Sequence, residues 1–228
     1  MAMQGRAALA MWWDMAPDHL AEFEHWHTHE HYPERLAIPG FRRASRWLDA
    51  NGGEAVFQLY ELAHSGVLTS QAYLERLNAP SPWSTRMMPH HRNMIRSQCK
   101  VIFSSGAVTA RHALTVRLSP ARGQAQALSK RLEPVLSELP MRAGLGGAHL
   151  LRHRAASIPL TTEQKIRGGD RHADWVLLVT GYDRSALDTL AEREFSEPAM
   201  RALGAAPGAE SGRFELSYSA TSADIATG

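Results

Sequence analysis

Residues His25–Phe41 read HWHTHEHYPERLAIPGF, and the rest of the fold can be worked out from this stretch. It carries four of the chain's twelve histidines. Upstream, Pro17 suits the first position of a helix, where its missing N–H costs nothing, so we expect a helix from Pro17 to about His31. Pro33 is expected to end this helix, because a proline disfavours helical geometry at the residue before it. The pair Pro39-Gly40 then turns the chain into a strand.

Short apolar or alternating segments surround this helix and predict strands. In the first half of the chain, the expected strands are Ala8–Trp13, Phe41–Leu48, Ala55–Leu62 and Met94–Phe103, and a second helix runs from Ser70 to about Asn78. Asn51-Gly52-Gly53 tolerates positive φ and marks a hairpin between the second and third strands. The resulting order, β-α-β-β-α-β, is the split βαβ arrangement of ferredoxin-like domains.

The same order of elements repeats in the second half of the chain. Here the expected strands are Ala113–Leu118, Ala148–Ala155, Asp174–Gly181 and Gly212–Ser219, and the expected helices are Gln124–Leu136 and Ser185–Glu194. Each repeat would leave one face of its sheet bare and apolar, and two such faces can pack on each other within one chain. We therefore predict an α+β fold of two tandem ferredoxin-like β-α-β-β-α-β repeats that share an eight-stranded, barrel-like core.

The two repeats are expected at residues 1–108 and 109–220, and a small polar tail at 221–228 is expected to fray. A polar insertion, Ser157–Arg171, is longer than a hairpin needs. Loops of this length are either lids or mobile segments. We expect a mobile segment, because the insertion has no apolar period.

The composition limits the kinds of partner the chain can have. Hydrophobic residues make up 44% of the 228 residues and charged residues 21%, which is ordinary for a globular protein with a buried core. The balance of 25 Lys+Arg against 23 Asp+Glu argues against a nucleic-acid partner. The single cysteine, Cys99, excludes an internal disulfide and fits a reducing compartment. Since no stretch reaches the length of a membrane span, we expect a cytoplasmic protein without a membrane partner.

The histidine-rich helix presents two different faces. With about 100° of rotation per residue, His27 and His31 fall on the side that faces the sheet, and His25 and His29 fall on the solvent side. We therefore expect the first pair to be more buried than the second. The spacing of His27 and His31 also permits a shared metal, with Glu30 or the distant His64 as a further ligand.

Without a metal, two interpretations of this inward pair remain. The histidines are a partly buried polar pair bonded to backbone or water, or they border a pocket in which His31 contacts a ligand. The position of His31 near the expected helix end favours its protonated form, whereas partial burial disfavours it.

Three side chains outside this helix are further candidates for ligand contact. Arg46, on the second strand, could bind an anionic or enolate oxygen, although a solvated face or a salt bridge would explain it as well. Tyr60, on the third strand, could offer its hydroxyl or be an ordinary core residue. Trp83, after the Pro80-Ser81-Pro82 break, could close the mouth of a pocket or simply pack on the sheet.

The motif Trp26-His27-x-x-Glu30-His31-x-Pro33, followed by Pro39-Gly40-Phe41, resembles the EthD-like branch of the dimeric α+β-barrel superfamily. The later segments Leu68-Thr69-Ser70-x-x-Tyr73 and Pro80-Ser81-Pro82-Trp83 are similar to the same group. The resemblance covers roughly Met11 to Phe103, and relatives often carry Tyr where this chain has His27. It implies a dimeric-α+β-barrel-type core within one chain.

The superfamily includes cofactor-independent monooxygenases, lactone isomerases and haem enzymes, and its ligands usually lie between the sheet and the covering helices. The resemblance thus implies a cofactor-independent enzyme of the monooxygenase or isomerase type, with neither cofactor nor metal, that acts on a small cyclic or aromatic compound. His31 would be the general base, with His27 beside it. The residues assigned to substrate contact are Trp26, Arg46, Tyr60 and Trp83.

Two alternatives to catalysis stay open: a non-catalytic small-molecule-binding protein that uses the same pocket, and a structural duplicate without a ligand. The helix Gln124–Leu136 of the second repeat carries no histidine. We therefore expect one polar pocket, under the first-repeat helix. The expected partner is a small molecule, and a homo-oligomer stays open.

Overall fold

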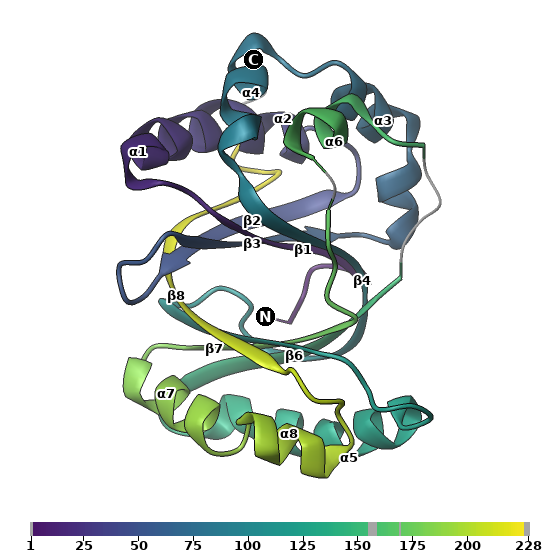
Figure 1. Ribbon diagram of the computed structural model, residues 1–228, viewed down its shortest axis with the longest axis vertical. Helices are drawn as coiled ribbons and strands as arrows, with labels where there is room; N and C mark the ends of the chain where they lie inside the picture. The colour runs from purple at the N-terminus through teal and green to yellow at the C-terminus, as the bar shows by residue number, and fades with distance from the viewer. Residues whose placement is uncertain (1, 155–158, 169, 226–228) are drawn as a thin grey trace.

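The computed structural model describes residues 2–154, 159–168 and 170–225, which form a closed antiparallel barrel with helices packed on its outside (Figure 1). The strand order around the barrel is β1-β3-β2-β8-β5-β7-β6-β4. The strands are β1 (Ala7–Asp14), β2 (Phe41–Asp49), β3 (Ala55–Leu62), β4 (Arg92–Gly106), β5 (His112–Leu118), β6 (Leu145–His153), β7 (Trp175–Gly181) and β8 (Glu210–Thr221). The seams between the two repeats are the antiparallel pairs β2–β8 and β4–β6. The predicted tandem ferredoxin-like fold is therefore confirmed.

Helices cover both sheets from outside, in two groups (Figure 1). The first sheet lies under α1 (Pro17–Trp26), α2 (Tyr32–Leu36), α3 (Gln71–Asn78), α4 (Pro82–Met87) and α6 (Thr162–Arg167). The second lies under α5 (Ala125–Glu138), α7 (Arg184–Glu192) and α8 (Glu197–Leu203). The helix α6 belongs to the second half of the chain and yet covers the first sheet. In the part of the chain that the structure describes, no helix is long and apolar enough to cross a membrane.

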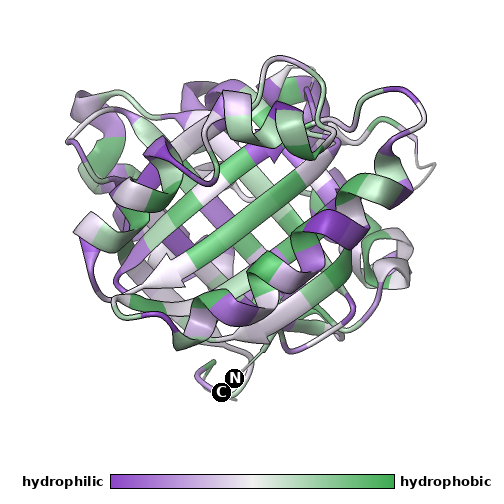
Figure 2. Ribbon diagram, turned by 90° about the horizontal axis from the view of Figure 1, so that it is seen from below, coloured by the Kyte–Doolittle hydropathy of each residue, from purple (hydrophilic) through white to green (hydrophobic). Residues whose placement is uncertain are grey.

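Strand alternation distributes the core over three layers. On β1, Trp13 points outward to the helices of the first repeat, and Trp12 points into the barrel. Inside the barrel, Phe57 stacks between Trp12 and Trp47, with ring centroids 5.0 and 5.2 Å away. A third apolar layer separates the second sheet from α5, α7 and α8. Figure 2 shows this sheet from below, with the hydrophobic colour gathered on the strands behind the helices.

The prediction that Pro33 ends the histidine-rich helix is wrong. The chain continues from α1 through a π-helical turn, His27–His31, into α2, which ends at Leu36. The Tyr32 N–H bonds to the carbonyl of His27, five residues back, so the π turn takes in one residue more than an α turn. The pattern of backbone hydrogen bonds therefore changes just before Pro33. Pro33, which has no N–H to donate, lies at the position where the pattern changes.

The insertion expected to be mobile contains an ordered helix in its described part. Thr161 and Gln164 form a capping box at the start of α6. Beyond α6, Arg171 pairs with β4: the Arg96 N–H bonds to the Arg171 carbonyl at 2.8 Å, and the Arg171 N–H bonds to the Met94 carbonyl at 3.2 Å. Residues 157, 158 and 169 of the predicted insertion lie outside the described residues.

The proposed boundary at 108/109 falls between β4 and β5. In the segment expected to fray, Thr221 is the last residue of β8, and Ile225 packs against the apolar layer of the first repeat. Residues 226–228 lie outside the described residues.

Candidate functional site

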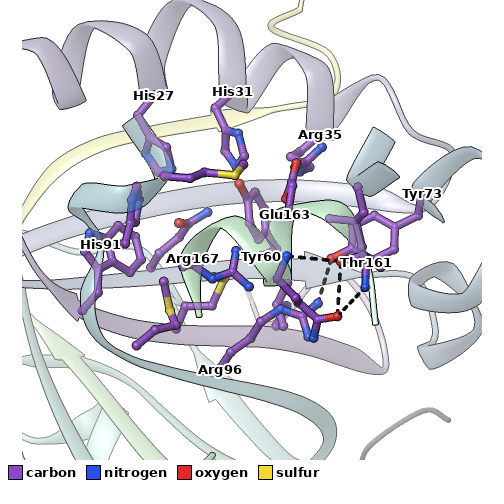
Figure 3. A pocket seen from close by; sticks show the side chains of 18 of the residues that line it. His27, His31, Arg35, Tyr60, Tyr73, His91, Arg96, Thr161, Glu163 and Arg167 are labelled. Atoms are coloured by element: carbon purple, nitrogen blue, oxygen red, sulfur yellow. Dashed lines mark hydrogen bonds and ion pairs between the residues drawn. The ribbon is translucent and has the colours of Figure 1, made fainter. Parts of the chain in front are cut away.

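A cavity lies under the histidine-rich helix, between that helix, strands β1, β3 and β4, and helix α6 (Figure 3). Its volume is about 40 Å³. A cavity needs about 10–15 Å³ of such volume to hold one water, so this cavity has room for only a few waters. Its walls combine histidines and arginines with aromatic, leucine and methionine side chains.

The predicted order of burial among the four histidines is confirmed. His27 is 1% exposed and His31 9%, whereas His25 and His29 are exposed. His27 and His31 lie four residues apart, a spacing that places both on one face of the helix. Figure 3 shows His27 and His31 pointing from this turn toward the cavity.

Three histidines border the cavity, and burial lowers the pKa of each. For His27, the neighbouring His31 and Arg46 act in the same direction as burial and hold its pKa well below the ordinary value. For His31, Arg35 and His91 add to burial, and its pKa is also well below the ordinary value. Burial and the charge of Arg167 lower the pKa of His91 to about 3. All three imidazoles are therefore neutral at pH 7. The expected helix-end effect on His31 is absent because the helix continues beyond it.

Hydrogen-bond partners assign the tautomers of two of these rings. Arg46 Nη1 lies 3.3 Å from His27 Nδ1, and since a guanidinium can only donate, His27 accepts at Nδ1 and carries its proton on Nε2. His91 Nδ1 lies 3.2 Å from the carbonyl oxygen of Met87, which can only accept, so His91 donates from Nδ1 and has its lone pair on Nε2. His31 Nδ1 is buried without a hydrogen-bond partner.

Unpaired polar atoms gather around this cavity. Nine buried side-chain nitrogen or oxygen atoms in the described residues have no hydrogen-bond partner, and five belong to residues that line it. They are Trp13 Nε1, His31 Nδ1, Arg35 Nη1, Gln58 Nε2 and Tyr60 Oη. Buried polar groups in folded proteins are normally paired. Since four of the five are N–H or O–H donors, the cavity is suited to a ligand rich in oxygen acceptors.

The charged groups of the site come from both halves of the chain. Arg35 forms a buried ion pair with Glu163 of α6, and the two side chains are only 3% and 4% exposed. Burial lowers the pKa of Arg35, but Glu163, Tyr73 and Tyr60 together offset this and leave it above the ordinary value. Arg96 donates to the Tyr73 hydroxyl at 2.8 Å. On α6, Arg167 pairs with Asp170 at 3.0 Å.

Of the residues assigned from sequence, the structure brings four together at the cavity: Trp26, His27, His31 and Tyr60. Trp26 packs on His31 with 4.6 Å between ring centroids. Tyr60 reaches the cavity from β3, and burial raises the pKa of its hydroxyl above the ordinary value.

Two assigned residues do not line the cavity. Arg46 lies behind His27 and bonds both to its Nδ1 and, at 3.2 Å, to Glu24 Oε1. Arg46 therefore contacts the site residue His27 and not the cavity itself. Trp83 lies on the outer side of α1: its Nε1 donates to Glu22 at 3.1 Å, and its ring packs against His25. Because α4 packs against the solvent side of α1, Trp83 cannot close the mouth of this cavity.

Several cavity residues were not assigned from sequence: Arg35, His91, Arg96, Glu163 and Arg167. Arg35 was detectable, since it continues the spacing of four from His27 and His31, and was missed because the helix was ended too early. For α6, the pattern Thr161-x-x-Gln164 is a readable capping-box signal. Nothing in the sequence around His91 indicates that it reaches the cavity.

The arrangement does not favour the metal interpretation of His27 and His31. Within the described residues, no group of three or more His, Cys, Asp or Glu side chains is placed to hold a metal ion. Glu30 accepts from Trp26 Nε1 at 3.0 Å and from the Ser81 hydroxyl. His64 lines a different cavity, beside Arg6 and Cys99.

Solved structures with the same fold cover nearly the whole chain. An anthrone oxidase-like protein aligns over 98% of this chain and 96% of its own, with a TM-score of 0.68 and 10% identity. A candidate monooxygenase from Fusobacterium nucleatum aligns over 96% of both chains, with a TM-score of 0.59 and 10% identity. A ferredoxin-fold protein from Listeria monocytogenes, related to antibiotic biosynthesis monooxygenases, aligns over 95% of this chain and 97% of its own, with a TM-score of 0.51 and 5% identity.

At these identities, the likeness shows a shared dimeric α+β-barrel fold and leaves the activity to be argued from the site. No protein-family model matches the chain, and no curated protein matches it.

Proposed function

We propose that this chain is a cofactor-independent enzyme, of the monooxygenase or isomerase type, that removes a proton from a small cyclic or aromatic compound. We assign it to the EthD-like branch, on the histidine-rich motif described above. The observation that carries the proposal is the cluster of unpaired buried donors around three neutral histidines. The names of the three structural neighbours, all of which refer to oxidases or monooxygenases, agree with it.

In the proposed reaction, His31 takes a proton from an acidified C–H or O–H of the substrate. The anion that forms is an enolate or phenolate, and its oxygen is held by donors from Gln58 and Tyr60. Fixed donors aimed at developing negative charge are usually the largest contribution to this kind of catalysis. The new anion also raises the pKa of the adjacent imidazole, so a histidine that is neutral at rest becomes a better base as the reaction proceeds.

The two reaction types differ in the fate of this anion. In a monooxygenase reaction at a methylene group, the carbanion reduces molecular oxygen and forms a hydroperoxide. The hydroperoxide loses water to leave a carbonyl, so a CH₂ group and O₂ become C=O and H₂O. In an isomerase reaction, the proton returns to a different carbon and no oxygen is consumed.

The test is turnover of a panel of anthrones, hydroquinones and lactones, followed by oxygen uptake and by exchange of substrate hydrogen with deuterated solvent. His31→Gln should lower the rate by about 10²-fold or more, the usual contribution of a positioned base. The matched control is His25→Gln, on the exposed face of the same helix, which should leave the rate unchanged. Equal rates in the two variants would remove His31 from the mechanism.

The alternative is a small-molecule-binding protein that uses the same cavity without chemistry. The same cluster would serve this alternative, because a ligand-binding cavity needs only neutral acceptors and donors. Ligands that bind with neither oxygen uptake nor hydrogen exchange would support it. A small molecule as partner and a cytoplasmic location remain part of both proposals.

A further inference from the structure

Helix α6 must move before a ring-sized ligand can enter the cavity. The volume of about 40 Å³ is far below the about 150 Å³ of a cavity that holds benzene. Most of the other walls are barrel strands and the continuous α1–α2 segment, which are fixed by their own hydrogen-bond ladders. In contrast, α6 has six residues, and among the described residues its polar ties to the first repeat are the ion pair with Arg35 and a bond from the Thr162 N–H to Asn78 Oδ1 at 3.1 Å.

Displacement of α6 has an electrostatic consequence at Arg35. Its partner Glu163 is carried away with the helix. Arg35 is 3% exposed while α6 is in place, and a ligand that fills the vacated space would bury the guanidinium again without the Glu163 carboxylate. An uncompensated buried charge is strongly destabilising. The nearby arginines cannot help, and the three cavity histidines are neutral. Whatever takes the place of α6 must therefore bring a negative charge to Arg35.

We infer that the ligand of this cavity is an aromatic or cyclic carboxylate, whose carboxylate replaces that of Glu163 on Arg35. This inference rests on the proposed function, since it names the substrate class of the same site. Glu163 then acts as an internal competitor that keeps Arg35 paired while the cavity is empty. Arg35 Nη1, which has no partner beside the occupied Nη2, gives an entering carboxylate a second donor for a two-point contact.

The opposite side of the cavity is suited to the ring. Trp13 and Trp26 supply aromatic faces, and Met88 and Met94 supply adaptable apolar contacts. Figure 3 shows Arg35 and Glu163 at one end of the cavity and His91 at the other, with His31 between them on the helix. A ligand with its carboxylate on Arg35 would extend its ring under His31 toward His91.

The test compares two matched pairs of probes, 2-naphthoate with 2-naphthamide and benzoate with benzamide. Binding is measured by calorimetry and by quenching of tryptophan fluorescence. Wild-type protein should prefer each acid over its amide. Glu163→Gln removes the competitor and should tighten binding of the acids by about tenfold, the effect of one charge-assisted hydrogen bond, with no gain for the amides. Lys165→Gln, an exposed charge change on the same helix, should stay within twofold of wild type.

The double variant Arg35→Gln/Glu163→Gln restores a neutral pair and should lose the preference for acids. It also keeps the test decisive if Glu163→Gln alone fails to fold. Any of three results would overturn the inference. The first is equal affinity for acid and amide in wild-type protein, and the second is an equal gain for both in Glu163→Gln. The third is no binding of either acid to wild-type protein or to Glu163→Gln. Acid preference without turnover would contradict the proposed enzyme only, and turnover of neutral aromatics without acid preference would contradict this inference only.

Discussion

The imidazole rings of His27 and His31 stack with 5.1 Å between their centroids and 14° between their planes. The two side chains leave the π-helical turn four residues apart, a spacing that places both on one face of the helix. Two rings at this distance cannot both be charged without strong repulsion, and both are buried. The helix therefore holds a pair of neutral imidazoles against the cavity.

The first prediction is that acid destabilises the fold through these groups. The pKa values of His27, His31 and His91 lie below 6.5 in the folded state, and that of His91 is about 3. Between pH 6.5 and its folded-state pKa, each of these histidines binds more protons in the unfolded chain than in the folded one. Their contribution is fully present above pH 6.5 and is lost as the pH falls. At pH 5, His91 should lower the free energy of unfolding by about 2 kcal/mol, and His27 and His31 should act in the same direction.

Urea unfolding at pH 7 and pH 5 measures this loss. His91→Gln should reduce the difference between the two pH values by about the share of one histidine, about 2 kcal/mol. His25→Gln, on the exposed face, is the control and should leave the difference unchanged. An identical pH difference in all three proteins would show that the buried histidines do not control acid stability.

The second prediction concerns tautomers. Because Arg46 donates to His27 Nδ1, neutral His27 should carry its proton on Nε2, and because His91 donates to the Met87 carbonyl, its proton should be on Nδ1. Long-range proton–nitrogen NMR correlations distinguish the two forms directly. Arg46→Met should change the His27 pattern and leave that of His91 intact. A proton on His91 Nε2 would contradict the assignment of its lone pair to that atom.

The repeated order of elements made the barrel predictable. Alternating apolar strands such as Ala55–Leu62, the turn at Asn51-Gly52-Gly53 and the matching second half are local signals, and the bare sheet faces then leave one way to bury them. Helical phase alone also separated His27 and His31 from the exposed histidines. These inferences needed only periodicity, which a single sequence contains.

The rest of the site depends on contacts between distant parts of the chain. The separation of Arg35 and Glu163 is 128 residues, and nothing local in a polar insertion indicates that its carboxylate will reach the histidine helix. His91 reaches the cavity from the turn before β4. The error at Pro33 had a local cause: the rule that proline ends a helix assumes a constant α register, and the π turn changes that register.

The third prediction separates two tryptophans that the sequence treated alike. Trp26 packs on His31, and its Nε1 bonds to Glu30 at 3.0 Å, whereas Trp83 lies outside the cavity. Trp26→Phe should weaken binding of 2-naphthoate by about tenfold, since it removes a buried ring contact with His31 and one of the donors to Glu30. Trp83→Phe should change the affinity less than twofold. Calorimetric titration decides, and a larger effect at Trp83 would place the ligand on the outer side of α1.

The last prediction is that α6 opens locally, without unfolding of the barrel. The Thr161 side chain caps the helix by accepting from the Gln164 N–H, and Thr161→Ala should cost about 1 kcal/mol of helix stability. If α6 opens by itself, its amides, such as the Lys165 N–H that bonds to the Thr161 carbonyl, should exchange with solvent about fivefold faster in the variant. Amides of the barrel pair β1–β3 should keep their wild-type rates, because they open only with the whole fold.

Association of 2-naphthoate with the Thr161→Ala variant should accelerate by a similar factor, since the open state is the one a ligand enters. Equal acceleration of α6 and barrel amides would show that the helix moves only when the whole protein unfolds, and entry to the cavity would then need another route.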